Sequence, residues 1–254
     1  MIEVKNLVFS YPRSKHKVFD GLNLTLKENR IYGLLGKNGM GKSTLLYLIA
    51  GLLRPKNGNV CVDGMESKDR RPEMLREIYV VPEEYNLPNL TLKQYVKVHQ
   101  DFYPRFSEEI LMNCLRDFEM QADVNFKHLS MGQKKKIYMS FAVASCCQLL
   151  LMDEPTNGLD IPSKALFRKV IAGNLPADSS LIISTHQVHD VEQLLDHVFI
   201  LNNSEMIIDA SVEEIAKQYE FTYRNANEMG EDVLYAHFVG IAVSKFVLFG
   251  NANE

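Results

Sequence analysis

The sequence contains few cysteines, and none of them forms a C-x-x-C pair. The four residues are Cys61, Cys114, Cys146 and Cys147. This spacing excludes the common zinc motifs and the thioredoxin-like redox motif. We therefore expect free thiols that are buried in a protein of a reducing compartment.

Long apolar runs are also missing. A membrane-spanning helix needs about 18 or more apolar residues, and the best candidates are interrupted by Gln148 and by the pair Ser244-Lys245. The first ten residues include Glu3 and have no apolar core, so no signal peptide is expected. These absences predict a cytoplasmic chain that does not cross a membrane by itself.

A strong excess of positive charge is absent as well. The formal net charge of the 254 residues is -4, whereas domains that coat nucleic acid are usually basic. We therefore expect no nucleic acid partner. The sequence has no internal repeat and no low-complexity segment, and its length suits one large domain or a core with an inserted lobe.

What the sequence does contain is an alternation of short apolar runs with helical patterns. Strands are expected within 31–36, 59–64, 78–83, 148–153, 180–185 and 197–202, and helices after Lys42, Ser130 and Pro162 and near Val188. This order predicts an α/β fold with a largely parallel sheet. Two further strands, within 2–11 and 19–30, are expected to pair antiparallel.

Two regions depart from the alternation. Leu90–Lys127 is helical in pattern and rich in aromatic residues, which predicts a helical lobe. Near the C-terminus, Ser211 and Glu214 have the spacing of a capping box and predict a short helix. The apolar segments 233–239 and 241–250 could then form a terminal hairpin.

A phosphate-binding loop follows the apolar run 31–35. Gly36–Ser43 reads GKNGMGKS and matches G-x-x-x-x-G-K-[ST] between a strand and a helix. Glycines permit a tight loop whose N–H groups wrap a triphosphate. We expect Lys42 to reach the β- and γ-phosphates of the triphosphate and the hydroxyl of Ser43 to bind Mg²⁺. The loop residues expected to contact the nucleotide include Asn38, Gly39 and Gly41.

Two carboxylates end the apolar run 148–152. Asp153 is placed to hold Mg²⁺, and Glu154 is a candidate base for the attacking water. His186 follows another predicted strand and could contact the γ-phosphate from the same edge of the sheet. A lone histidine is more often structural, so its role depends on the other motifs.

The stretch HLSMGQKKK, residues 128–136, predicts a helix start. Ser130 and Gln133 have the spacing of a capping box. The exposed N–H groups of such a helix end suit an anion. Lys134, Lys135 and Lys136 follow, and we expect them to lie at the surface.

Together these motifs resemble the ATP-binding cassette (ABC) family, over about residues 4–203. Residues 129–133 are similar to its signature motif, Asn157–Asp160 to its D-loop and His186 to its switch histidine. The resemblance implies a P-loop ATPase core in residues 1–210, with an antiparallel β subdomain and a helical lobe inserted at about 86–130. Residues 211–254 would form a C-terminal extension.

The resemblance also implies how the site works. Two ATP-binding subunits, expected to be a homodimer, would face head to tail with Mg²⁺ and ATP between them. One subunit would contribute the P-loop, including Thr44, and the other would contribute Ser130, Gly132, Gln133 and Asp160. Tyr11 resembles the aromatic residue that stacks on adenine, although a strand tyrosine is more often part of the core.

Two positions depart from the family pattern. Met131 replaces the first glycine of the signature motif, and its side chain could crowd the phosphate or point away. Glu83 stands where the family usually has the Q-loop glutamine. A carboxylate there could still bind Mg²⁺, so we include it among the expected metal ligands with a changed charge.

The function implied is ATP hydrolysis that powers solute export or import through separate permease subunits, which would hold this chain at the inner face of the membrane. Within the family, the chain resembles bacterial ABC-2-type and antibiotic-export subunits. The alternative is a soluble ABC ATPase that acts as an assembly scaffold. The short gap between P-loop and signature disfavours a repair clamp with a coiled-coil insertion, and the single cassette disfavours a translation factor.

Overall fold

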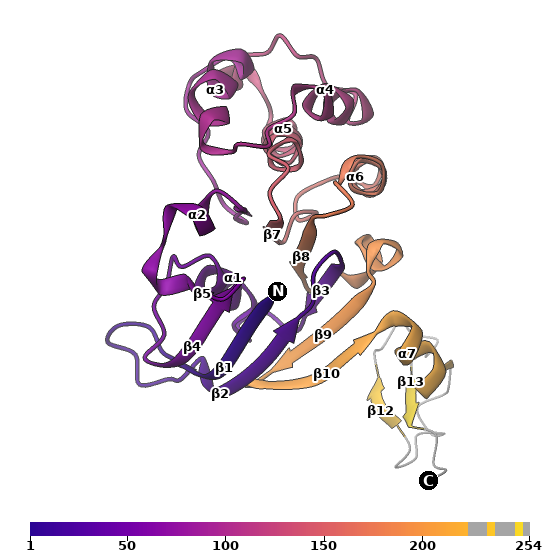
Figure 1. Ribbon diagram of the computed structural model, residues 1–254. Helices are drawn as coiled ribbons and strands as arrows, with labels where there is room; N and C mark the ends of the chain where they lie inside the picture. The colour runs from indigo at the N-terminus through magenta and orange to yellow at the C-terminus, as the bar shows by residue number, and fades with distance from the viewer. Residues whose placement is uncertain (223–232, 237–246, 251–254) are drawn as a thin grey trace. The chain divides into compact units, whose positions relative to one another are not determined.

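The computed structural model describes residues 1–222, 233–236 and 247–250 (Figure 1). The chain forms two compact units, Met1–Asp209 and Ala210–Glu254. All of the chemical motifs belong to the first unit.

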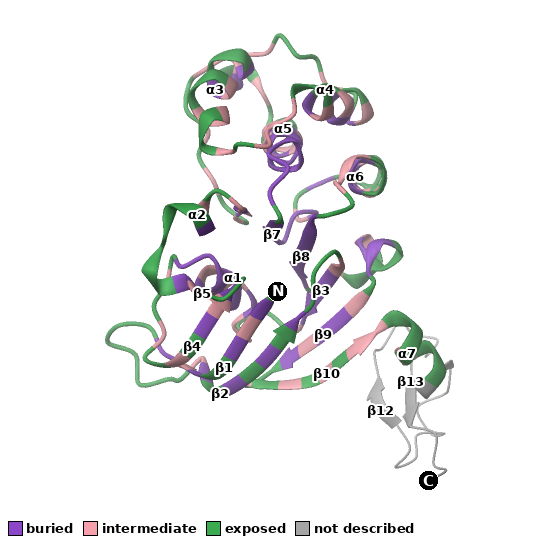
Figure 2. Cartoon of the chain, viewed as in Figure 1, coloured by how far each residue is buried: buried purple, intermediate pink, exposed green. Residues whose placement is uncertain are grey.

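A six-stranded sheet is the centre of the first unit. Its strand order is β10-β9-β3-β8-β7-β6. The strands are β3 (Ile31–Leu35), β6 (Ile78–Val81), β7 (Leu149–Asp153), β8 (Ser180–Thr185), β9 (His197–Asn202) and β10 (Glu205–Ser211). The five strands from β9 to β6 run parallel. Every residue of β7 and β8 is buried (Figure 2), as expected for parallel strands covered on both faces.

A four-stranded antiparallel sheet forms the second layer, in the order β2-β1-β4-β5. Its strands are β1 (Ile2–Phe9), β2 (Phe19–Leu26), β4 (Asn57–Val62) and β5 (Met65–Glu66). Buried side chains of these strands join those of helix α1 (Lys42–Ile49) and of the parallel sheet in one apolar cluster. Because α1 begins at the phosphate-binding loop, this cluster also fixes the loop.

The helical lobe is confirmed. It contains α3 (Leu92–His99), α4 (Glu108–Asp117) and α5 (Met131–Ala144), with short turns at Gln100–Phe102 and Phe126–His128. Phe141 of α5 is fully buried and its ring contacts Tyr95 and Phe106. The lobe aromatics therefore serve mainly as core. Two other helices complete the first unit, α2 (Pro72–Leu75) and α6 (Ile161–Asn174), and α6 packs against α4.

The segment near Val188 corrects an expectation. Instead of a helix, it forms two short 3₁₀ turns, Val188–Asp190 and Glu192–Leu194. The carbonyl of Asp190 accepts a hydrogen bond from the guanidinium of Arg168 on α6 (3.2 Å), so a tertiary contact satisfies a group that a helix would use internally. Strands β5 and β10 and helix α2 were not expected from the sequence.

The first helix of the second unit is α7 (Val212–Gln218). The capping box at its start is confirmed, since the Ser211 hydroxyl accepts from the Glu214 amide and the Glu214 carboxylate accepts from the Ser211 amide. A small sheet follows in the order β11-β13-β12, formed by Tyr219–Thr222, Val247–Gly250 and Val233–Ala236. The rest of the segments expected to form a terminal hairpin lies outside the described residues. No helix in the described part of the chain has the length and apolar character needed to cross a membrane.

The core of the lobe generates a stability prediction. Phe141→Ala should lower the free energy of unfolding by about 3–5 kcal/mol, because it leaves a cavity among buried rings. Phe102→Ala, at a side chain that is 64% exposed, should change it by no more than about 0.5 kcal/mol. Urea denaturation followed by circular dichroism measures both values, and equal losses would contradict the assignment of Phe141 to the lobe core.

Candidate functional site

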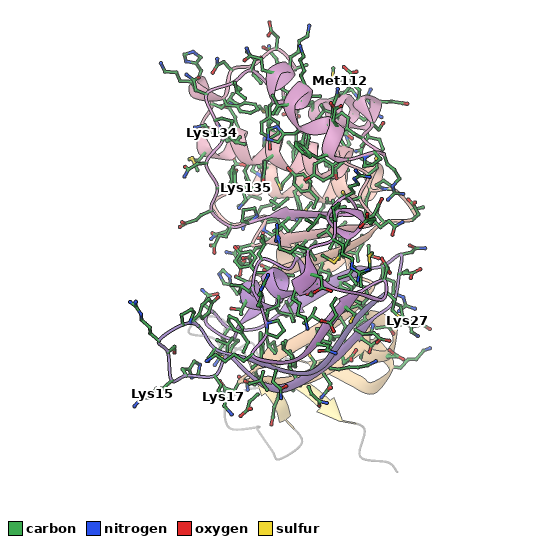
Figure 3. The ribbon with its side chains drawn as sticks, turned by 60° about the vertical axis from the view of Figure 1, so that its left-hand side comes forward. Lys15, Lys17, Lys27, Met112, Lys134 and Lys135 are labelled. Carbon is green, nitrogen blue, oxygen red and sulfur yellow. The ribbon has the colours of Figure 1, made fainter. Side chains whose placement is uncertain are left out.

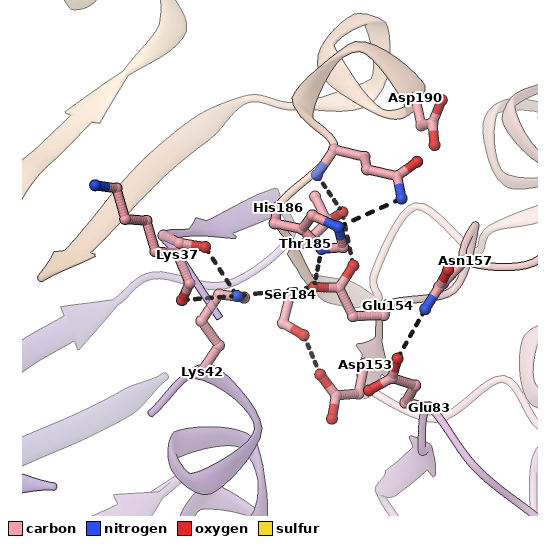
Figure 4. A network of polar contacts seen from close by, with 12 residues as sticks. Lys37, Lys42, Glu83, Asp153, Glu154, Asn157, Ser184, Thr185, His186 and Asp190 are labelled. Atoms are coloured by element: carbon pink, nitrogen blue, oxygen red, sulfur yellow. Dashed lines mark hydrogen bonds and ion pairs between the residues drawn. The ribbon is translucent and has the colours of Figure 1, made fainter. Parts of the chain in front are cut away.

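The candidate site lies where β3, β7 and β8 end. Because these strands are parallel neighbours, the segments that follow them meet at one edge of the sheet (Figure 4). A cavity of about 450 Å³ opens there. It is lined by Tyr11, Val18, Asn38, Gly39, Gly41, Lys42, Ser43, Thr44, Glu83, Glu154, Asn157 and His186. Ten of these twelve residues were predicted from the sequence.

The loop after β3 has a backbone that requires glycine at two positions. Gly36 has a φ of 150°, and a Cβ there would come within 2.5 Å of the carbonyl oxygen of Leu201. Gly41 has a φ of 98°, in the left-handed region, and a Cβ would meet Val18 and Phe19 below 3.0 Å. Both positions exclude larger residues. The loop can therefore stay close to the sheet and leave its N–H groups for a ligand.

Lys42 is buried at the first position of α1. Its ammonium donates to the carbonyls of Gly36 (2.8 Å) and Lys37 (3.3 Å) and lies 3.7 Å from Oε1 of Glu154. The ammonium is thus held at the phosphate-binding loop between two main-chain carbonyls and a carboxylate. A phosphate oxygen would offer the same cation a stronger partner.

Glu154 has an unusual backbone conformation, and both of its carboxylate oxygens have a hydrogen-bond partner. Its φ is 44°, a left-handed conformation that costs roughly 1–3 kcal/mol outside glycine. One carboxylate oxygen pairs with Nδ1 of His186 (2.8 Å), and the other accepts from the hydroxyl of Thr185 (3.0 Å). The carboxylate is therefore aimed into the cavity by two residues at the end of β8.

Asp153, the last residue of β7, lies behind the cavity wall. It is 1% exposed, and burial raises the pKa of its carboxyl, although hydrogen bonds from Ser184 and Ser43 oppose the rise. The hydroxyl of Ser43 thus joins the phosphate-binding loop to this carboxylate. With Glu83 on the cavity wall, the site offers a hydroxyl and two carboxylates, which are the hard oxygen donors that Mg²⁺ prefers.

Glu83 follows β6 and is exposed. Its Oε1 accepts a hydrogen bond from the side-chain amide of Asn157 (2.8 Å), as Figure 4 shows. This contact links the segment after β6 to the segment after β7. Asn157 was not among the residues predicted for the site, although it stands in the sequence DEPTNGLD directly after the two carboxylates.

Tyr11 stands at the mouth of the cavity. Its ring is 42% exposed and packs edge-on against Phe9, and its hydroxyl bonds to that of Thr44 (2.9 Å). A half-exposed ring held from behind can offer one face to a planar ligand.

The predicted helix start at Ser130 is confirmed, but it does not line the cavity. Ser130 and Gln133 form the expected capping box, with the side chain of each accepting from the backbone amide of the other. Gly132 and Asp160 are likewise absent from the cavity lining. Met131 is 66% exposed, so its side chain projects from the helix start toward solvent.

The expectation that all three lysines lie at the surface is wrong for Lys135. This residue is 6% exposed, and its ammonium donates to the carbonyls of Glu154 and Asn157, both at 2.8 Å. Burial lowers its pKa, whereas the carboxylates of Glu83, Glu154 and Asp153 act in the opposite direction. The sequence pattern missed this contact because adjacent lysines on a helix point to different sides.

Comparisons with known proteins agree with this arrangement. Residues 19–157, more than half of the chain, match the family model described as ABC transporter. The methionine import ATP-binding protein MetN of Carboxydothermus hydrogenoformans is 31% identical over 229 residues, covering 85% of this chain and 67% of that protein. The Nod factor export ATP-binding protein I of Cupriavidus metallidurans is 29% identical over 206 residues, covering 79% and 68%.

A solved structure has the same fold. It is titled the dimeric structure of MJ0796, a bacterial ABC transporter cassette, and it superposes with a TM-score of 0.72 at 24% identity over 84% of this chain and 99% of that one. The order of the strands, the helical lobe and the phosphate-binding loop are all consistent with the family whose model matches the chain. The chain belongs to the ABC transporter family, as an ATP-binding subunit that hydrolyses ATP to drive transport.

Proposed function

We propose that this ATPase works as a homodimer in which each ATP is enclosed by the P-loop of one copy and the Ser130 helix start of the other. The observation that carries the proposal is a separation within one chain. Lys42 and Glu154 share a cavity, whereas Ser130, Gly132, Gln133 and Asp160 do not line it. A helix start with free N–H groups suits a phosphate, and a second copy would supply one.

Within one copy, the roles follow from the contacts. Lys42 binds the β- and γ-phosphates, and the loop residues Asn38, Gly39, Gly41 and Thr44 surround them. Tyr11 stacks on adenine. Mg²⁺ would be held by Ser43, Asp153 and Glu83, where it neutralises phosphate charge. Glu154 accepts the proton of the attacking water, and His186 orients Glu154 and contacts the γ-phosphate.

The chain would act with membrane partners. ABC cassettes associate with permease subunits, and we propose that such subunits hold this chain at the inner face of the cell membrane, with no nucleic acid partner. Residues 1–210 would form the ATPase domain, with the helical lobe at about 86–130, and residues 211–254 an extension. Relatives serve import and export by their names, and the narrower resemblance favours export.

Lys42→Ala should reduce the rate of ATP hydrolysis by at least about 100-fold, because the phosphate loses a buried cation at the moment when charge develops. The matched control is Lys56→Ala, at an exposed lysine outside the cavity. Phosphate release measured at saturating ATP tests both variants. Undiminished hydrolysis by Lys42→Ala would remove this residue from the site.

Glu83→Gln should leave the Kd for ATP within about threefold and change kcat by at least about threefold, because it alters the charge beside the metal with little change in size. Glu84→Gln, at the exposed neighbouring carboxylate, should leave both values unchanged. Equal kcat values for Glu83→Gln and the unmodified protein would show that Glu83 is not at the metal.

Glu154→Gln tests the dimer. It keeps the shape of the side chain but removes the base, so closed dimers should accumulate with ATP and Mg²⁺ and should be absent without ATP. Adding Ser130→Arg should prevent dimerisation, because a long side chain would occupy the phosphate position. Size-exclusion chromatography with light scattering measures both states.

The single variant Ser130→Arg should still bind ATP at its own P-loop. Monomers in every condition would contradict ATP-driven pairing. A double variant that still dimerises with ATP would show that the Ser130 helix does not face a phosphate.

A further inference from the structure

Lys135 is an unexpected buried cation. On α5 the buried side chains besides Lys135 are apolar or small: Ile137, Met139, Ser140, Phe141, Ala142, Val143 and Ala144. Taking an ammonium out of water is costly unless strong partners replace the solvent. If this position served only to pack α5 on its neighbours, an apolar residue would do so at lower cost. We therefore expect Lys135 to have a role that depends on its ammonium group.

The partners of the ammonium are two main-chain carbonyls of one short segment. Lys135 donates to the carbonyl of Glu154 and to that of Asn157, both at 2.8 Å. The side chain of Lys134, the neighbouring residue on the helix, is half-buried and lies apart from that of Lys135 (Figure 3). Two charge-assisted hydrogen bonds to residues three apart clamp the turn between them.

This turn carries the left-handed residue of the site. Glu154 has a φ of 44°, and such a conformation persists only when the surrounding structure determines it fully. Its amide donates to the carbonyl of Ser184 (2.9 Å), and Thr185 and His186 hold its carboxylate. The carbonyl is the remaining polar group, and it accepts hydrogen bonds from the Asn157 amide (3.1 Å) and from the ammonium of Lys135 (2.8 Å). Each polar group of Glu154 thus has a partner, and the carbonyl is the group with a partner on α5.

The clamp extends to a second carboxylate. The Asn157 carbonyl is held by Lys135, and the side-chain amide of the same residue donates to Glu83. The orientation of Glu83 therefore depends on where the turn places Asn157. Lys135 also places a positive charge near the carboxylates of Glu83, Glu154 and Asp153.

We propose that Lys135 is a positioning residue for ATP hydrolysis, which fixes the turn Glu154–Asn157 and thereby sets the directions of Glu154 and Glu83. The proposal rests on the proposed roles of these two carboxylates. Because Lys135 stands two residues after Gln133 of the capping box, the helix whose start is proposed to meet the partner's ATP also holds the catalytic turn of its own chain.

Two measurements on Lys135→Met test this role, with Lys134→Met as the matched control. The first is steady-state hydrolysis. Lys135→Met should lower kcat by at least about 10-fold, since small misplacements of reacting groups can cost up to 100-fold. The KM for ATP should stay within about threefold, because Lys42 and the P-loop do not contact Lys135. Lys134→Met should leave both values within about twofold.

The second measurement is hydrogen–deuterium exchange of the nucleotide-free protein, which does not depend on catalysis. The amides of Glu154, Asn157 and Leu159 are hydrogen-bonded within or next to the turn. Their exchange in Lys135→Met should be at least about fivefold faster, with no change in α1, because a local contact governs local opening. If Lys135→Met does not fold, Lys135→Ala, which also removes the donor, is measured by the same criteria.

The outcomes separate the proposal from its alternatives. Unchanged exchange in the turn, or a kcat within twofold of the Lys134→Met value, would overturn it. Faster exchange in α1 and β8 as well would show a general loss of stability and would also overturn it. If Glu154→Gln hydrolyses ATP normally, the proposed role of Glu154 fails, and the exchange result still reports whether Lys135 holds the turn.

Discussion

The nucleotide chemistry of this chain depends on the parallel register of three neighbouring strands. In that register Leu35 lies opposite Thr185 and Asp153 lies opposite Ser184, so β3, β8 and β7 end at the same level. The phosphate-binding loop, the carboxylates and His186 each follow directly from one of these ends. Because the strands are buried on both faces, a slip of one residue would be opposed by the whole core. The positions at which the site residues begin are therefore fixed by the packing of the sheet.

Charge balance is the second constraint. Asp153, Glu154 and Glu83 bring three carboxylates to one small region, and two buried ammonium groups face them. Lys42 comes from the first turn of α1, and Lys135 comes from the helical lobe. Since the interior screens charge poorly, the opposite charges attract one another across this region. Fixed charges of both signs are therefore already in place around the cavity.

The helical lobe contributes to the site as well as to the shape of the domain. Helix α5 has an exposed, capped start and a buried middle that includes the aromatic cluster around Phe141. Lys135 lies between these parts and contacts the turn after β7. A displacement of the lobe would therefore move the turn that contains Glu154, because packed elements transmit strain.

The sequence by itself determined the features that depend on near neighbours. The phosphate-binding loop, the paired carboxylates and the capping boxes at Ser130 and Ser211 use residues a few positions apart, so their geometry is local. The parallel sheet followed from the order of apolar runs, and ten of the residues that line the cavity were recognisable from motifs and family resemblance.

Only the tertiary structure decided the features that join distant segments. Whether Lys135 lies in solvent or in the core depends on which face of α5 meets the turn after β7. The link between Glu83 and Asn157 spans 74 positions. The segment near Val188 forms 3₁₀ turns instead of the expected helix, and Arg168 on α6 bonds the carbonyl of Asp190 there. In each case the packing of helices and strands brings a polar group next to its partner. The spacing of residues along the chain does not reveal that packing.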